Sequence, residues 1–371
     1  MLMRILTCIT LCFITIHSAS ALTVVDLAGR TVKLDKPATR IILGEGRFIA
    51  AIGILDRKNP VKRIVGMLGE FKKFDPAGYA VYAKSFPEIE NIPLFGLTSK
   101  SSVSVEKAIA LKPEVAIFGL SGHGPSARSK PLIDKLEAAG IKTVFIDFRD
   151  NPLANTIKSI ALLGKVMGRD KEAAEYIEFY KKELARVTDV VKTIKSKKPT
   201  IFLETHVGAS NECCRTIARG MISAFIEYVG GANISKKIIP GISGVVNLEY
   251  LIAQQPDIYI GTAIGTVAAS KKAPTRIVLG ADSSPEHAAN SLKRAMARPG
   301  MATLTAVKNK RVYAIWHHYY NSPLNIIAIQ AFAKWIHPEH FKDLDPAETL
   351  KTLHSRFQPL PATGKYLVEL E

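Results

Sequence analysis

Cysteine is scarce in this sequence. Only four occur among 371 residues: Cys8 and Cys12 near the N-terminus, and the adjacent Cys213 and Cys214. In an oxidising compartment the adjacent pair can form a disulfide. However, neighbouring Cα atoms across a trans peptide lie about 3.8 Å apart, closer than the roughly 4.4 Å minimum that is usual for disulfides. A vicinal disulfide and two free thiols therefore both remain open, and we interpret either as stiffening a loop.

Long apolar segments are also lacking. The 12-residue run at 5–16 is too short for a membrane span, which needs about 20 residues. A single arginine precedes this run and Ala-Ser-Ala follows it at 19–21, so we predict a cleavable signal peptide over residues 1–21. Neither Cys8 nor Cys12 follows a small residue, which argues against a lipid anchor. We therefore expect an exported, soluble protein that is not lipid-anchored.

Acidic residues are outnumbered by basic ones, 33 to 50, which gives a formal net charge of +17. Basic proteins often bind nucleic acid, but an exported one more plausibly meets an anionic small molecule or a membrane face. We expect no nucleic-acid partner.

Catalytic motifs are missing as well. There is no G-x-x-x-x-G-K-[ST] phosphate loop and no H-E-x-x-H zinc motif. The stretch GLSGHG at 119–124 nearly matches the nucleophile elbow G-x-S-x-G, but His123 replaces the last glycine. Ser121 has no evident acid partner in the sequence. We therefore predict that the chain is not an enzyme and keep an exported hydrolase only as an alternative.

One unit occurs twice in the chain. Residues 104–119 (SVEKAIALKPEVAIFG) align without gaps on 247–262 (NLEYLIAQQPDIYIGT). Each copy begins with a helix-capping Ser or Asn, stops before a proline and continues into an apolar run typical of a buried strand. Strands that alternate with helices predict mainly parallel sheets. We expect two similar α/β lobes, residues 22–150 and 197–371, with a ligand cleft between them and further helices at the C-terminal end.

The lobes are predicted to be joined by a helical linker over residues 151–196. Within it, apolar residues recur at three- and four-residue steps over 170–195, which predicts one amphipathic helix roughly 40 Å long. Its expected buried face consists of Ile177, Tyr180, Leu184, Val187, Val191 and Ile194. A single stiff helix implies only small movements of the lobes.

Together these segments resemble the bacterial periplasmic binding proteins for iron–siderophore complexes, haem and vitamin B12, the substrate-capture subunits of ABC importers. The resemblance rests on the order and spacing of the two repeat copies, VVDLAGRTVKLDKPATRII (24–42), AVKNKRVYAI (306–315) and SPLNIIAIQAFAKWIHPEHFKDLDPAETL (322–350). It implies a monomer without a cofactor that captures an iron chelate and delivers it to inner-membrane permease subunits. Haem and a corrinoid are the alternative ligands.

Loops beyond the carboxyl ends of the strands are expected to line the cleft, because ligands of open parallel sheets bind there. They contain Arg47, Arg128, Arg149 and Arg215. A guanidinium group stays charged and binds carboxylates through two hydrogen bonds. These arginines therefore suit the anionic periphery of an iron chelate.

The same loops contain histidines and tyrosines that can contact a ligand. His123 and His206 fall one in each lobe, and His317, Tyr319 and Tyr320 belong to the WHHYY stretch after a predicted strand. Successive residues of a strand face opposite sides, so all these adjacent rings cannot converge on one metal unless the chain turns among them. We expect one or two of them to flank a bulky chelate, and a tyrosine or histidine could also ligate haem.

A direct zinc or manganese site is a minor alternative. It would join loop histidines to Glu45 or Glu204. No pair of candidate ligands has a fixed helical or hairpin spacing, so we predict no metal site.

Glu106 and Glu249 occupy equivalent positions in the two repeat copies. Locally, each is a carboxylate in the first turn of a helix, which the helix dipole favours. The resemblance implies a second role, in which one glutamate on each lobe docks to arginines of the permease.

Overall fold

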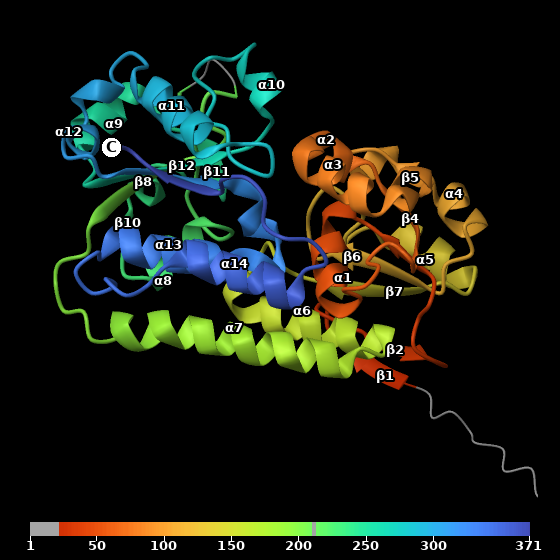
Figure 1. Cartoon of the computed structure of the whole chain (residues 1–371). Coiled ribbons are helices and arrows are strands. Elements are labelled where there is room, and N and C mark those ends of the chain that lie inside the picture. The colour runs from red at the N-terminus through yellow and green to blue at the C-terminus, as the bar shows by residue number, and fades with distance from the viewer. Residues whose placement is uncertain (1–21, 210–212) are drawn as a thin grey trace, which may run out of the picture.

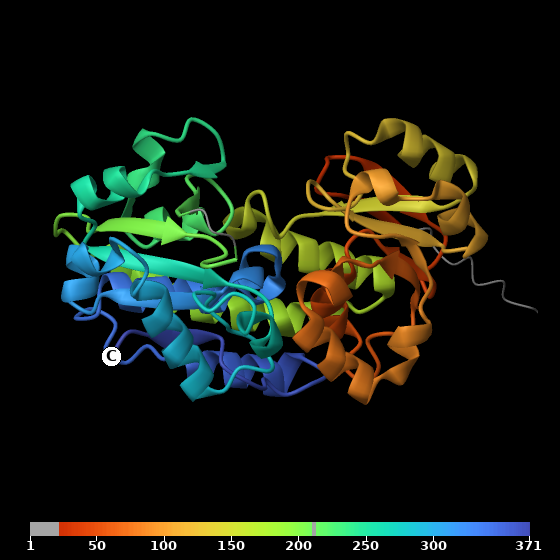
Figure 2. The same ribbon diagram turned by 90° about the horizontal axis from the view of Figure 1, so that it is seen from above.

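The computed structural model describes residues 22–209 and 213–371. Figure 1 shows two α/β lobes side by side above the long helix α7 (Asp170–Val191). The view from above in Figure 2 shows the same separation into two lobes bridged by helices. The predicted signal peptide lies outside the described residues. Within the described residues, no helix is long and apolar enough to cross a membrane.

The N-terminal lobe contains a five-stranded sheet in the order β5-β4-β3-β6-β7, and every pair of neighbours is parallel. The strands are almost fully buried because helices cover both faces of the sheet, as is usual for parallel sheets. A small antiparallel hairpin, β1 with β2, precedes it. The strand bounds are β1 Leu22–Val25, β2 Thr31–Leu34, β3 Ile41–Leu43, β4 Ile64–Leu68, β5 Leu94–Gly96, β6 Val115–Gly119 and β7 Lys142–Ile146.

The C-terminal lobe has a seven-stranded mixed sheet. Its order is β11-β9-β8-β12-β13-β14, and β10 also pairs with β8. The centre, β8-β12-β13, is parallel as predicted, whereas β9, β11 and β14 run antiparallel to their neighbours. The strand bounds are β8 Thr200–Glu204, β9 Arg215–Ile217, β10 Ala232–Asn233, β11 Ser243–Val245, β12 Ile258–Ala263, β13 Val312–Trp316 and β14 Leu367–Glu369.

The repeated unit forms the same structure in both lobes. Helices α4 (Val105–Ala110) and α9 (Leu248–Gln254) lead into β6 and β12, which are interior strands of the two sheets. The side chains of Ser104 and Asn247 accept hydrogen bonds from backbone N–H groups of the first turn, which confirms the predicted N-caps.

The remaining helices surround the sheets and connect the lobes. Helices α13 and α14 lie between α7 and the C-terminal sheet (Figure 1). The bounds are α1 Ile49–Leu55, α2 Glu70–Phe74, α3 Pro76–Ser85, α5 Lys130–Ala138, α6 Pro152–Met167, α8 Ser223–Tyr228, α10 Val267–Ser270, α11 Pro285–Met296, α12 Thr305–Lys308, α13 Ile326–Ile336 and α14 Pro346–Phe357.

The long helix differs from its prediction in length and in the width of its buried face. It ends at Val191 instead of 195, so its 22 residues span roughly 33 Å. Tyr180 and Val187 of the predicted face are buried, and its other members are partly buried against the core. The buried face is wider than predicted and also includes Tyr176, Phe179 and Glu183, because α7 packs against α6, α13 and α1.

One hydrophobic core runs through both lobes by way of these helices. Hydrogen bonds reinforce the junction: Tyr180 Oη donates to Asn325 Oδ1 (2.7 Å), and Asn325 Nδ2 donates to Thr156 Oγ1 (2.8 Å). Gln358, after α14, donates to the carbonyl of Ala50 in α1 (3.0 Å). The lobes therefore share a rigid base, and their strand ends face each other above it.

Candidate ligand-binding site between the lobes

Loops from both lobes meet in a polar contact layer, which we define as Glu45, Arg47, Arg149, His318, Tyr320 and Asn321. The first three residues follow β3 and β7 of the N-terminal lobe, and the last three follow β13 of the C-terminal lobe. The sequence prediction that strand ends line the space between the lobes is thus confirmed.

Arg47 makes the central contact across this layer. It donates through Nη2 to Glu45 Oε2 (2.9 Å), and its Nε lies 3.6 Å from Glu70 Oε1. It also donates through Nη1 to His318 Nδ1 (2.8 Å). Because arginine has only N–H donors, Nδ1 of His318 must accept, and its Nε2–H donates to the carbonyl of Phe74 (3.1 Å). His318 is therefore neutral, and burial holds its pKa well below the ordinary value.

Glu45 joins four groups at the same point. It accepts hydrogen bonds from Arg47, from Asn321 Nδ2 (2.8 Å) and from the backbone N–H of His123 (2.9 Å), and Arg149 Nη2 lies 3.4 Å away. Burial raises the pKa of Glu45, but the charges of Arg149 and Arg47 outweigh this effect and lower it overall. Glu45 therefore remains ionised and orients both arginines.

Glu70 is a second buried carboxyl, next to Arg47 of the contact layer. It accepts hydrogen bonds from the N–H groups of Gly46 (2.9 Å) and Arg47 (3.0 Å). Burial raises its pKa to about 7, although the charge of Arg47 acts in the opposite direction. We did not predict Glu70, because nothing in its local sequence distinguishes it from a surface glutamate at the start of a helix.

Two more histidines lie together on the C-terminal side. The ring centroids of His206 and His317 are 4.0 Å apart, and His317 Nδ1 lies 2.8 Å from Thr262 Oγ1. Burial lowers the pKa of both, that of His206 to about 4 with a contribution from the charge of Arg215. Both are therefore neutral at pH 7 and retain nitrogen lone pairs for a ligand.

A groove of about 540 Å³ opens beside this layer. It lies between N-terminal loops at 98–100 and 120–128 and C-terminal residues 219–221 and Ile242. We call it the interlobe groove. Lys100 and Arg128 line it, both exposed, and neither has an ion pair within the described chain. His123 and Arg219 line it as well. One carboxylate, Asp150, lines the groove beside the cations Lys100, Arg128 and Arg219, so the lining is positive on balance. The volume lies within the usual range for small-molecule sites.

The structure brings most of the predicted residues together. Arg47, Arg149 and Tyr320 belong to the contact layer, where the Arg149 guanidinium stacks on the Tyr320 ring at 4.9 Å. His123 lines the groove, and Arg215 acts on the pKa of His206. Predicted contacts with a ligand are not tested by this arrangement and stay predictions.

Tyr319 takes a different position from its neighbours. The chain turns through a short 3-10 helix at His317–Asn321, which directs Tyr319 away from the groove. It is fully buried against Trp316 and Tyr366, with ring centroids 5.1 and 6.1 Å away. The expectation that this tyrosine faces a chelate in the groove is therefore not met.

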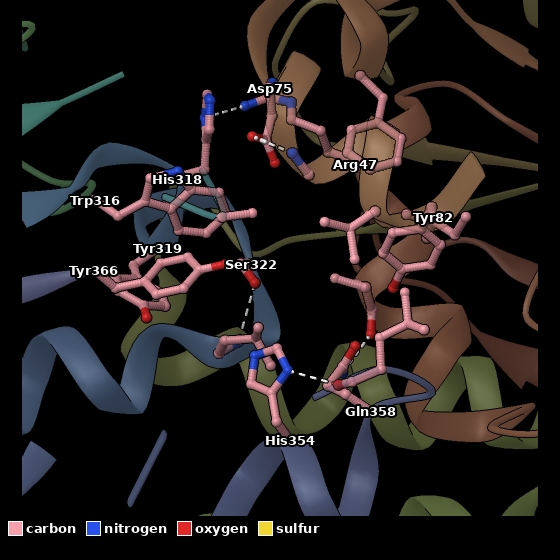
Figure 3. Close-up of a pocket in the computed structure, with 18 of the residues that line it drawn as sticks. Arg47, Asp75, Tyr82, Trp316, His318, Tyr319, Ser322, His354, Gln358 and Tyr366 are labelled. Atoms are coloured by element: carbon pink, nitrogen blue, oxygen red, sulfur yellow. Dashed lines mark hydrogen bonds between the residues drawn. The ribbon is translucent and has the colours of Figure 1, made fainter. Parts of the chain in front are cut away.

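Tyr319 instead lines a separate cavity of about 90 Å³, which Arg47, His318 and Asn321 of the contact layer also line. We call it the rear cavity. Figure 3 shows Trp316, Tyr319 and Tyr366 on one side of it and Tyr82 on the opposite side. Asp75 lies at one end, and His354 and Gln358 lie at the other.

The alternative metal site gains no support. Within the described residues, the only three potential ligands that converge are Glu204, Cys213 and Cys214. Arg298 binds Glu204 through two hydrogen bonds (2.7 and 2.8 Å), and the two cysteines form a disulfide with each other. The disulfide, one of the two predicted states of this pair, therefore occupies both sulfur atoms.

The hydrolase alternative has little geometric basis. The hydroxyl of Ser121 donates to a carboxylate oxygen of Asp150. In the described part of the chain, no hydrogen bond connects Ser121 to a histidine that could act as its base.

Comparison with known proteins gives the class. The sequence model of the periplasmic binding protein family matches residues 90–318, which is more than half of the chain. The chain belongs to this family of periplasmic binding proteins.

Individual relatives agree with this assignment. The TroA-like periplasmic binding protein FepB of Veillonella parvula is 29% identical, with a TM-score of 0.85 over 94% of this chain and 100% of that one. The protein MolA of Haemophilus influenzae, bound to molybdate, is 17% identical, with a TM-score of 0.65 over 92% and 99%. An ABC transporter substrate-binding lipoprotein of Bacillus subtilis, YvrC, is 22% identical over 71% of this chain and 72% of its own.

The family consists of binding proteins for ABC transporters, which implies a small-molecule ligand and a membrane permease as partners. The Bacillus subtilis relative is named as a lipoprotein, whereas Cys8 and Cys12 argue against an anchor here. Both cysteines lie outside the described residues, so the absence of an anchor stays a prediction.

Proposed function

We propose that this protein captures an anionic ferric siderophore in the interlobe groove and delivers it to an ABC importer. The observation that carries the proposal is the lining of the groove, where Lys100 and Arg128 stand exposed and unpaired among the described residues beside the neutral histidine His123. An anionic chelate would gain charge-assisted hydrogen bonds from both cations.

The size of the groove favours a chelate over a simple oxyanion. A relative of the same fold is bound to molybdate, an ion of only five atoms. The groove here measures about 540 Å³, within the roughly 300–1,000 Å³ typical of drug-sized ligands. A tetrahedral oxyanion would leave most of this volume to water.

Haem receives less support. It would need an axial ligand from a tyrosine or histidine that faces the ligand. Tyr319 is buried beside the rear cavity, and Tyr320 is buried beneath the Arg149 guanidinium. Among the predicted haem ligands only His123 lines the groove.

A ligand panel tests the proposal. The purified protein is titrated with ferric hydroxamate, catecholate and carboxylate siderophores, haem and cobalamin, with tryptophan fluorescence and absorbance as readouts. We expect saturable quenching by at least one ferric siderophore and no Soret shift with haem. Binding of haem or cobalamin alone would contradict the siderophore assignment.

Delivery is proposed to depend on Glu106 and Glu249. Both are exposed in the first turns of α4 and α9, which lie on opposite lobes on the side away from α7 (Figure 1). Replacing both glutamates by alanine should leave ligand affinity unchanged, because neither lines the groove. Uptake into cells should fall at least tenfold, and unchanged uptake would refute docking through these residues.

A further inference from the structure

The rear cavity is chemically unlike the groove. Its walls are aromatic: the rings of Trp316 and Tyr319 meet at 83° with centroids 5.1 Å apart, and those of Trp316 and Tyr366 meet at 87° at 5.4 Å. These three rings, in edge-to-face contact through Trp316, line one side of the cavity, and Tyr82 lies on the opposite side (Figure 3). Aromatic rings carry partial negative charge on their faces, and all four rings line this cavity.

The cavity also carries a negative charge at one end. Asp75 caps α3 by accepting the N–H of Gly78 through Oδ1 (3.1 Å). No arginine or lysine forms an ion pair with Asp75 in the described chain. Burial raises the pKa of Asp75 to about 6, so the carboxyl is largely ionised at neutral pH.

The basic groups of the cavity lining form no direct contact with this carboxylate, although the charge of Arg47 lowers the pKa of Asp75 in part. Arg47 is paired with Glu45 and Glu70, and His318 is neutral. His354 Nδ1 lies 2.9 Å from the carbonyl of Leu360, and burial lowers the pKa of this histidine. The hydroxyl of Tyr319, fully buried, has no hydrogen-bond partner. An aromatic cavity with a carboxylate that has no direct ion pair among the described residues, and with a free hydroxyl, is suited to a cation that carries apolar groups.

Size and access fit a small molecule. A volume of about 90 Å³ is several times the roughly 10–15 Å³ that one water needs. A surface groove between α3 and residues 266–282 adjoins the cavity and shares Val81 and Ala281 with it. Asp282 and Lys84 both line that entrance.

We propose that the rear cavity binds a small organic cation of the methylated-ammonium class, with its ammonium head between Asp75 and the rings of Trp316, Tyr319, Tyr366 and Tyr82. A metal ion would need more oxygen ligands than Asp75 supplies, and an anion would meet the Asp75 carboxylate. This site is separate from the groove and does not depend on the identity of the ligand that the groove takes.

Choline and 3,3-dimethylbutan-1-ol provide the test, because the alcohol has the same shape without the charge. Each is titrated into the full chain by calorimetry, and saturation-transfer NMR follows the methyl groups. We expect choline to bind at least tenfold more tightly than the alcohol. Equal affinity, or no choline binding at 10 mM, would overturn the proposal.

Two substitutions locate the site. Asp75→Asn keeps an N-cap acceptor but removes the charge, and Trp316→Leu removes one wall; each should weaken choline binding at least tenfold. Asp134→Asn, on the exposed face of α5, is the matched control and should bind choline like the wild type. Circular dichroism confirms that each variant is folded. Unchanged binding in folded Asp75→Asn would refute the site. No iron chelate enters these experiments, so their result is independent of the proposed function.

Discussion

Three histidines between the lobes are kept neutral by their surroundings. Burial is the largest cause of the lowered pKa of His206, His317 and His318. The charges of Arg47 and Arg149 add to it for His317 and His318, and those of Arg215 and Arg276 add to it for His206. A buried imidazole surrounded by guanidinium groups has no favourable charged state. His206 and His317 can therefore accept hydrogen bonds near neutral pH and lose that ability on protonation, whereas both ring nitrogens of His318 are already bonded, to Arg47 and to the carbonyl of Phe74.

The pKa of His206 leads to a stability prediction. The folded pKa is about 4 and the unfolded value is about 6.5, so its stabilising contribution is complete above pH 6.5 and is lost as the pH falls toward 4. Between pH 7.5 and 5 the wild type should lose on the order of 1–2 kcal/mol more of its unfolding free energy than His206→Asn. Asparagine tolerates the positive φ of 54° at this position.

Urea unfolding at the two pH values measures this difference. The exposed His340 serves as the control, and His340→Asn should follow the wild type. Glu70 and Asp75 have raised pKa values, so their titration changes the unfolding free energy with pH in the opposite direction. Because both residues are present in all three proteins, their contribution cancels in the comparison. Parallel pH dependence of wild type and His206→Asn would contradict the account.

Sequence reasoning found the basic and aromatic residues of the site but, apart from Glu45, which was named only as a metal-ligand alternative, it missed the acidic ones. Arg47, Arg149, His206 and His317 follow predicted strands, and the position of strand ends in a parallel sheet was enough to group them. Glu70 and Asp75 lie at the starts of helices, where a carboxylate is expected on local grounds alone. Their burial results from tertiary packing and leaves no local sequence signal.

The helices and strands that could be predicted are those with a clear hydrophobic periodicity or a recognisable helix cap. Helices α4 and α9 and the strands after them have caps, prolines and apolar runs in equivalent places, so the two lobes could be inferred. Strands β9, β11 and β14 have only three residues each. Three residues are too few to show an alternating pattern, and the antiparallel margins of the second sheet were missed.

Helix α7 shows where periodicity misleads. Its buried positions include Tyr176, Tyr180 and Glu183, and Glu183 Oε2 accepts hydrogen bonds from Gln330 (2.8 Å) and Arg186 (2.8 Å). A pattern of aliphatic residues cannot identify buried polar groups such as Glu183, whose partner Gln330 lies 147 residues away in the sequence. These partners make α7 a fixed support for both lobes.

The Tyr180 hydroxyl on α7 should contribute measurably to the free energy of unfolding. Tyr180→Phe removes the donor to Asn325 Oδ1, and Asn325 is fully buried. An unsatisfied buried acceptor costs about 1–3 kcal/mol, so the unfolding free energy should fall by that amount in urea titrations. Tyr250→Phe, whose hydroxyl has no hydrogen bond in the described part of the chain, should change it by less than about 0.5 kcal/mol. Equal effects of the two substitutions would argue against a stabilising hydrogen bond between Tyr180 and Asn325.

At the scale of the whole molecule, the two lobes pack on the same set of helices and face each other across polar loops. The continuous core through α6, α7, α13 and α14 restricts the lobes to small movements. Arg47 with His318 and Glu45 with Asn321 form direct contacts between the lobes. A ligand in the groove beside these contacts therefore binds to a largely preformed site, which lowers the entropic cost of capture.

The most direct test of this account is the affinity for the best ferric siderophore of the panel in the double variant Lys100→Gln, Arg128→Gln. Both residues line the groove, so the dissociation constant should rise at least tenfold. Lys142→Gln is the control, because Lys142 is exposed at the start of β7, at the opposite end of the strand from the groove; its affinity should stay within twofold of the wild type. An unchanged dissociation constant in the double variant would contradict capture of an anionic chelate in the interlobe groove.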